Sequence, residues 1–151
     1  MKILIIRHGD PDYELDSLTE KGFREAKLLA TRLKNEKVDD FYCSPLGRAQ
    51  RTSEPTLACF GKSAEMLDWL QEFRGRIKSP FSGKERISWD LPPHLWCRDE
   101  KNYELHNWHE SELIKAGTAK EFFDKTAEGV DQLLARYGVA RDGRAYIGES
   151  D

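Results

Sequence analysis

The sequence has few cysteines and no long apolar run. Its three cysteines, Cys43, Cys59 and Cys97, form neither a CxxC pair nor a Cys/His spacing typical of metal sites. An odd number of cysteines without such spacing favours free thiols, so we expect a cytoplasmic protein. The apolar run at residues 3–6 is too short for a secretion signal or a membrane span, and it is typical of a buried strand instead.

The sequence also lacks a dominant charge. Its 24 Lys and Arg residues nearly balance 27 Asp and Glu residues, which gives a net charge of −3. This balance disfavours a nucleic-acid or membrane partner, because such binders present a basic face. It is compatible with a small anionic substrate, for which a few arginines in a cleft suffice. The sequence does not indicate an oligomeric state.

Two apolar segments, each followed by a helical pattern, predict an α/β fold. The β-branched run at residues 2–6 is typical of a central parallel strand buried on both faces. Thr19 is a suitable N-cap for an amphipathic helix over about residues 20–34. A second strand is expected at residues 38–43, and a helix over about residues 44–58 follows it. This order favours a three-layer α/β sandwich with a mostly parallel sheet.

The second half of the sequence is less regular. A short third strand is expected at residues 66–70, and residues 75–115 are expected to form an irregular or partly helical insertion. A capping-box pattern at residues 118–121 predicts a helix that ends near Gly138, and a strand is expected to begin at residues 145–147. We expect one domain over residues 1–151 that includes the insertion.

Basic residues follow both of the first two expected strands. Arg7 and His8 end the first, and Arg48 and Arg51 lie in the helix after the second. Ligands of open parallel sheets bind at the carboxyl ends of strands, so we expect both pairs to face one crevice. Arginine forks and helix N-termini bind phosphate. A neutral histidine nitrogen between arginines is then a candidate nucleophile toward phosphorus.

An ester leaving group needs a proton, which a nearby carboxylic acid can supply. Glu72 follows the third expected strand and is our first candidate for this acid. Asp10 is the second candidate, although a capping or loop carboxylate is the alternative interpretation of that residue.

Three sequence blocks occur in a fixed order: RHG at residues 7–9, LTEKG at residues 18–22, and SPLGRAQRTSE at residues 44–54. Together they resemble the signatures of the histidine phosphatase superfamily, the phosphoglycerate mutase-like proteins. With Glu72 nearby, the resemblance covers about residues 1–75, half of the chain. It implies a phosphoglycerate mutase-like fold.

The resemblance also implies an activity. His8 would be the nucleophile of a phosphatase that hydrolyses a small phosphate monoester through a phosphohistidine. Arg7 and Arg48 would clamp the phosphoryl group, and Glu72 would be the acid. Family members need no metal and no organic cofactor.

Further residues near these blocks are candidate substrate contacts. Gly9, Asp10 and Arg51 join Arg7 and Arg48 as candidate substrate-binding residues. For Arg51, a structural ion pair on the helix is an equally good interpretation.

One family feature is missing from the sequence. The family's second histidine, usually followed by glycine after a later strand, has no counterpart among His94, His106 and His109. We expect the parent chain to continue beyond residue 151 and to supply it. The alternatives are a catalytically impaired module that binds a phosphate ester or a protein, and a phosphomutase of the same family. The pair His106 and His109 has a spacing that suits a metal, but without a third ligand a surface or packing role is favoured.

Overall fold

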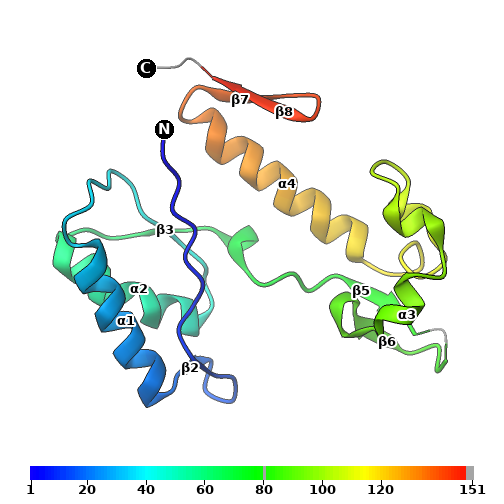
Figure 1. The fold of residues 1–151 in the computed structure, drawn as a ribbon, viewed down its shortest axis with the longest axis horizontal. Helices are drawn as coiled ribbons and strands as arrows, with labels where there is room; N and C mark the ends of the chain where they lie inside the picture. Colours follow the sequence, from blue (N-terminus) through cyan, green and yellow to red (C-terminus); the bar gives the residue numbers. More distant parts are fainter. Residues whose placement is uncertain (80, 149–151) are drawn as a thin grey trace. The chain divides into compact units, whose positions relative to one another are not determined.

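The computed structural model describes residues 1–79 and 81–148 (Figure 1). The chain divides into two compact units, Met1–Gln71 and Glu72–Asp151. Both combine helices with two-stranded sheets, so the expected mixed α/β character is confirmed. The expected single domain with an insertion at residues 75–115 stays a prediction. None of the described helices combines the length and the apolar character needed to cross a membrane.

The first unit is built around two packed helices. Its elements, in chain order, are β1 (Pro11–Asp12), β2 (Ser17–Leu18), α1 (Glu20–Leu33), β3 (Tyr42–Cys43), α2 (Gly47–Phe60), β4 (Glu65–Met66) and the 3₁₀ helix η1 (Asp68–Leu70). α1 and α2 lie side by side (Figure 1). Strands β1 and β2 form an antiparallel pair, whereas β3 and β4 are parallel.

Helix α1 forms where the sequence predicts it. The hydroxyl of Thr19 accepts a hydrogen bond from the Gly22 N–H and caps the helix. The buried residues of α1 are small, namely Gly22, Ala26 and Ala30. Small residues allow close packing, and a Cβ at position 22 would come within 2.3 Å of the Asp10 carbonyl oxygen. The N-terminus of α1 is therefore fixed directly against the loop that follows His8.

The predicted first strand differs from the structure. Residues 1–9 carry no regular secondary structure, and the side chains of residues 3–6 are exposed, up to 94% for Ile5. A buried parallel strand needs a hydrogen-bonded neighbour on each side. In the described residues β3 pairs with β4 alone, and three of the four two-stranded sheets are antiparallel. The finer expectation of a mostly parallel three-layer sandwich stays a prediction.

The second unit contains the β5–β6 hairpin and an apolar core, neither of which was predicted from the sequence. Its elements are β5 (Arg76–Lys78), β6 (Glu85–Ile87), η2 (Ser88–Asp90), α3 (Pro93–Trp96), η3 (Glu100–Tyr103), η4 (Trp108–Glu110), α4 (Ala119–Ala135), β7 (Val139–Asp142) and β8 (Ala145–Gly148). The core cluster consists of buried apolar residues, Ile77, Leu91, Leu95, Ile114 and Ala119. The segment expected to be an irregular insertion therefore supplies most of this core.

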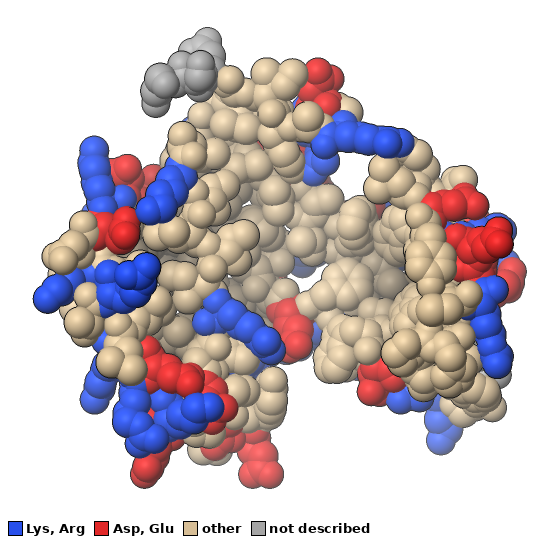
Figure 2. All heavy atoms as spheres, in the orientation of Figure 1, with Lys and Arg blue, Asp and Glu red and all other residues tan. Residues whose placement is uncertain are grey.

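On the face shown in Figure 2, charged side chains of both signs lie in groups that are separated by broad areas of other residues. Blue and red side chains are interspersed there, without a broad region of one sign. The near balance of positive and negative residues in the sequence is therefore also seen locally on this face.

Candidate active site

The loop that contains the RHG block is bound to helix α2. The Gly9 N–H donates to Thr52 Oγ1 at 3.0 Å, and the Thr52 hydroxyl donates to the Arg48 carbonyl oxygen at 2.8 Å. Thr52 is 6% exposed, so this connection is shielded from water. The structure therefore places His8 and the arginine-bearing helix in one region of the first unit, as the sequence predicts.

A second contact determines which nitrogen of the neutral His8 ring carries the proton. Nδ1 lies 2.8 Å from the Gly9 carbonyl oxygen. Because a carbonyl can only accept, this contact requires the proton on Nδ1. In the neutral ring, Nε2 then carries a lone pair, as a nucleophile must.

Arg48 is held inside the first unit. Its side chain is 7% exposed, and Nη1 donates to Asp16 Oδ1 at 2.7 Å. The guanidinium carbon lies 5.4 Å from the centroid of the Tyr13 ring, within the range of a cation–π contact. Arg48 is thus a buried, oriented cation on the first turn of α2, which suits phosphate binding.

Asp10 has the surroundings of a loop carboxylate. Its Oδ2 accepts from the Thr19 hydroxyl at 2.7 Å, and its backbone N–H donates to Glu25 Oε2 at 2.8 Å. The Thr19 hydrogen bond, assisted by Lys21, lowers the pKa of Asp10. A lowered pKa makes Asp10 a poor proton donor near neutral pH, so the geometry favours the alternative interpretation of this residue.

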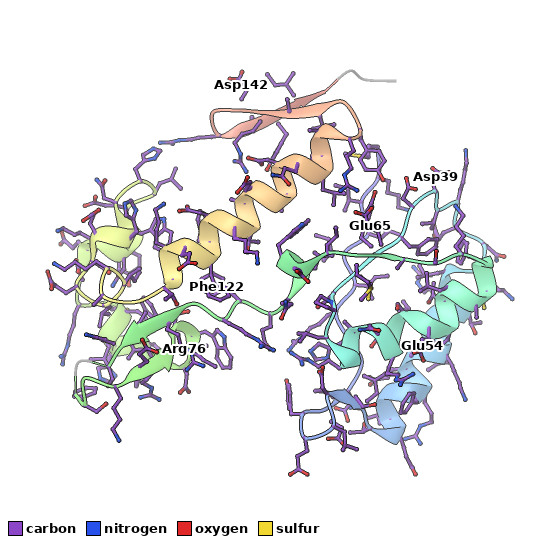
Figure 3. All side chains as sticks on the ribbon, turned by 180° about the vertical axis from the view of Figure 1, so that it is seen from behind. Asp39, Glu54, Glu65, Arg76, Phe122 and Asp142 are labelled. Carbon is purple, nitrogen blue, oxygen red and sulfur yellow. The ribbon has the colours of Figure 1, made fainter. Side chains whose placement is uncertain are left out.

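The other candidate residues, Arg51, Arg7 and Glu72, are exposed. Arg51 pairs with Glu54 at 2.6 Å on the exposed side of α2, where Figure 3 labels Glu54. This is the structural ion pair considered from the sequence. Arg7 is exposed, and Glu72 is an exposed residue at the start of the second unit. The roles of Arg7 and Glu72 stay predictions.

The two later histidines have protein partners. His106 Nε2 lies 2.9 Å from Arg144 Nη2, and His109 Nε2 lies 3.3 Å from Glu110 Oε1. The His109 ring also contacts Trp108 edge-on. Residues 1–79 and 81–148 contain no group of three His, Cys, Asp or Glu side chains arranged to hold a metal ion. His106 is exposed and His109 is partly buried, so these contacts favour the surface or packing role expected for the pair.

Sequence reasoning missed the residues that hold the loop and the arginine in place. Thr52 was visible as a member of the third block, four residues after Arg48, but its bond to Gly9 was not predictable without the fold. Glu25 has the helical spacing of a residue facing the loop. Asp16 carried no signal, because its contact with Arg48 joins positions 32 residues apart.

Comparison with known proteins identifies the family. The model of the histidine phosphatase superfamily (branch 1) matches residues 3–139. The chain belongs to this superfamily. The resemblance stated from residues 1–75 is thereby confirmed, and it extends well into the second unit.

Relatives within the superfamily include a mutase and phosphatases. The chain is 37% identical over 139 residues to the 2,3-bisphosphoglycerate-dependent phosphoglycerate mutase of Thermoplasma acidophilum, covering 80% of this chain and 67% of that protein. It is 24% identical over 151 residues to the adenosylcobalamin/alpha-ribazole phosphatase of Salmonella typhi, covering 94% of this chain and 69% of that one.

Solved structures share the fold. Mycobacterial hydrolase 1 matches with a TM-score of 0.54 at 20% identity, over 87% of this chain and 64% of that one. A mycobacterial glucosyl-3-phosphoglycerate phosphatase matches with a TM-score of 0.53 at 22% identity, over 87% of this chain and 62% of that one. The chain thus spans somewhat less than two thirds of these structures.

Proposed function

We propose that this chain provides the phosphate-binding and nucleophilic part of a phosphatase that hydrolyses a small phosphate monoester through phospho-His8. The observation that carries the proposal is the hydrogen-bonded connection from Gly9 through Thr52 to Arg48. It joins the loop of the candidate nucleophile to a buried arginine. The connection reaches the backbone of Arg48, and phosphoryl transfer requires a nucleophile and an oriented cation that act on the same phosphoryl group.

The proposed reaction has two steps. His8 Nε2 attacks phosphorus while the ester P–O bond breaks, and Glu72 gives its proton to the leaving oxygen. Water then attacks the phosphorus of phospho-His8, Glu72 takes a proton from that water, and inorganic phosphate leaves as the N–P bond breaks. Arg7 and Arg48 would hold the phosphoryl oxygens in both steps. The reaction needs no metal and no organic cofactor.

Gly9 and Asp10 belong to the proposed site as parts of its loop. The backbone N–H groups of both residues are hydrogen-bonded to helical side chains, Thr52 and Glu25. They therefore act by shaping the loop beside His8. Arg51 is proposed as a secondary phosphate contact, in competition with its partner Glu54.

The proposal includes the finer architecture and location expected from the sequence. The parallel pair of β3 and β4 supports a mostly parallel three-layer sandwich, in which residues 2–6 would form a strand only with neighbours that the described residues do not supply. Three free cysteines support a cytoplasmic location. Neither a nucleic acid nor a membrane is proposed as a partner.

A phosphomutase is the second candidate function. The 37% identity to a phosphoglycerate mutase favours it. The two candidates differ in the acceptor of the phosphoryl group from His8, which is water for a phosphatase and a second phosphoglycerate hydroxyl for a mutase. Adding 3-phosphoglycerate with 2,3-bisphosphoglycerate separates them, because a phosphatase releases inorganic phosphate and a mutase forms 2-phosphoglycerate.

The central test is turnover of p-nitrophenyl phosphate by the full-length protein and two histidine variants. His8→Ala should lower kcat by about 10³-fold or more, because it removes the nucleophile. The matched control His94→Ala changes an exposed histidine of the second unit and should stay within about twofold. Quenched wild-type protein should carry an acid-labile, base-stable phosphate that His8→Ala lacks. Equal turnover by wild type and His8→Ala would show the mechanism to be wrong.

A further inference from the structure

Asp16 has an unusual backbone conformation. It lies in the turn between β1 and β2 with φ 44°, the one positive φ of a non-glycine residue in the described ranges. Aspartate is among the few residues that tolerate this left-handed region. Such outliers persist where surrounding contacts hold them in place.

The Asp16 carboxylate provides those contacts. Its Oδ2 accepts from the Gly47 N–H at 2.7 Å, and its Oδ1 accepts from Arg48 Nη1 at 2.7 Å. Leu46, the N-cap residue of α2, makes no side-chain cap, so Asp16 caps this helix from 31 residues away. The approach is close, because a Cβ at position 47 would lie 2.1 Å from the Asp16 carbonyl oxygen.

One carboxylate therefore fixes both the start of α2 and the direction of the Arg48 side chain. The Gly47 N–H holds Oδ2, and this fixes the position of Oδ1 as well. The hydrogen bond to Oδ1 therefore favours one orientation of the Arg48 guanidinium. The Tyr13 ring lies beside the same guanidinium. A guanidinium has five N–H donors, and the Asp16 contact uses Nη1. An arginine oriented in advance loses less side-chain freedom when it binds phosphate.

We propose that Asp16 is a positioning residue for Arg48. It presets the guanidinium for a phosphoryl group and acts on that group only through the arginine. This inference rests on the proposed function of Arg48 as a phosphate contact. The opposite arrangement, in which Asp16 competes with phosphate for Arg48, predicts the reverse effect on affinity.

The test compares variants that remove one negative charge from the same turn. Asp16→Asn keeps an oxygen for the Gly47 N–H and tolerates positive φ, but it loses the charge opposite Arg48. The matched control is Asp12→Asn, because Asp12 Oδ1 accepts from the N–H groups of Glu14 and Leu15 in the same turn. Circular dichroism and thermal unfolding of both variants verify that they fold.

The readouts are the Kd of inorganic phosphate and the kinetics of p-nitrophenyl phosphate with the full-length protein. Asp16→Asn should raise the Kd and lower kcat/KM about tenfold, as expected for one charged hydrogen bond, whereas Asp12→Asn should stay within about twofold. Asp16→Asn should have no further effect in an Arg48→Ala background, because its effect passes through the arginine. Tighter phosphate binding by Asp16→Asn, equality with Asp12→Asn, or additive effects with Arg48→Ala would each overturn the proposal.

The outcomes separate this inference from the proposed function. If the wild-type protein binds phosphate but turns over no ester, the proposed function fails, and the phosphate affinities still decide the role of Asp16. If it turns over the ester and Asp16→Asn matches Asp12→Asn, only the role of Asp16 fails. If it neither binds phosphate nor turns over ester, both proposals are wrong.

Discussion

At the scale of residues, the candidate site depends on hydrogen bonds that hold its loop and its arginine. Thr52 is the centre of this arrangement, because one hydroxyl accepts from Gly9 and donates to the Arg48 carbonyl. The bond to Arg48 is buried and the bond to Gly9 is partly buried, so water replaces them poorly when they are lost. The loop of the candidate nucleophile therefore depends on the Thr52 side chain.

Thr52→Val tests this dependence. Valine keeps the shape but leaves the Gly9 N–H without its acceptor, which should cost about 1–3 kcal/mol of stability and lower kcat/KM. The matched control is Thr31→Val, because the Thr31 hydroxyl makes a similar bond to the Lys27 carbonyl at an exposed position of α1. Chemical denaturation should show a change below about 0.5 kcal/mol for the control. Equal stability losses in the two variants would contradict the special role of Thr52.

At the scale of elements, the long helices and strands β3 and β8 lie where the sequence predicts them, whereas most of the other short strands were not predicted. α1 follows from its Thr19 cap and its apolar spacing, and α4 follows from its apolar spacing. The capping box predicted for α4 is wrong, because Thr118 makes no side-chain cap and its hydroxyl accepts from the Arg76 N–H instead. Strands β5 and β6 have three residues each, too few for an alternating pattern to stand out in the sequence. The strand expected at residues 2–6 is absent for another reason, since its composition is suitable but no strand within residues 1–79 and 81–148 pairs with it.

The residues of the candidate site were predictable where they lie in short sequence blocks, and not where they depend on contacts between distant segments. The sequence predicts His8, Gly9 and Arg48 as candidates because the three blocks are short continuous segments. Asp16 was not predictable, because a positive φ and a contact across 32 residues depend on how the β1–β2 turn meets α2. Local sequence patterns do not predict contacts between segments that lie this far apart in the chain.

Strand β5 provides a test of the second unit. Ile77 is fully buried in the core cluster, so Ile77→Ala should lower the free energy of unfolding by about 2–5 kcal/mol. Ile147→Ala removes the same atoms from β8, where the side chain is 58% exposed, and should cost below about 0.5 kcal/mol. Denaturant titration followed by tryptophan fluorescence measures both. Similar losses for the two variants would show that β5 does not carry this core.

At the scale of the whole molecule, three aspartates link stability to acid pH. Hydrogen bonds lower the pKa of Asp10 mainly through Thr19, of Asp16 mainly through the Gly47 N–H, and of Asp131 mainly through Arg141. A carboxyl with a lowered pKa in the folded state stabilises the fold when it is ionised. Its contribution is complete above the ordinary pKa of about 3.9 and is lost as the pH falls through the folded-state pKa.

We therefore expect the Tm to be nearly constant from about pH 7 to 5 and to fall progressively below about pH 4. Thermal unfolding across this range measures the trend. Asp131→Asn should flatten the acid decrease, because it removes one of the three linked groups, whereas Asp39→Asn is the control for loss of charge alone. A Tm that rises below pH 4 would contradict the sign of the linkage.

The exposed residues 3–6 also affect how copies of this polypeptide meet in solution. Four consecutive Ile and Leu residues in an extended backbone form a segment of the kind that promotes aggregation. Lys2 and Arg7 stand at its two ends. Two such segments paired in register, in either direction, would place positive charges opposite one another. Because like charges repel, we expect Lys2 and Arg7 to disfavour such pairing.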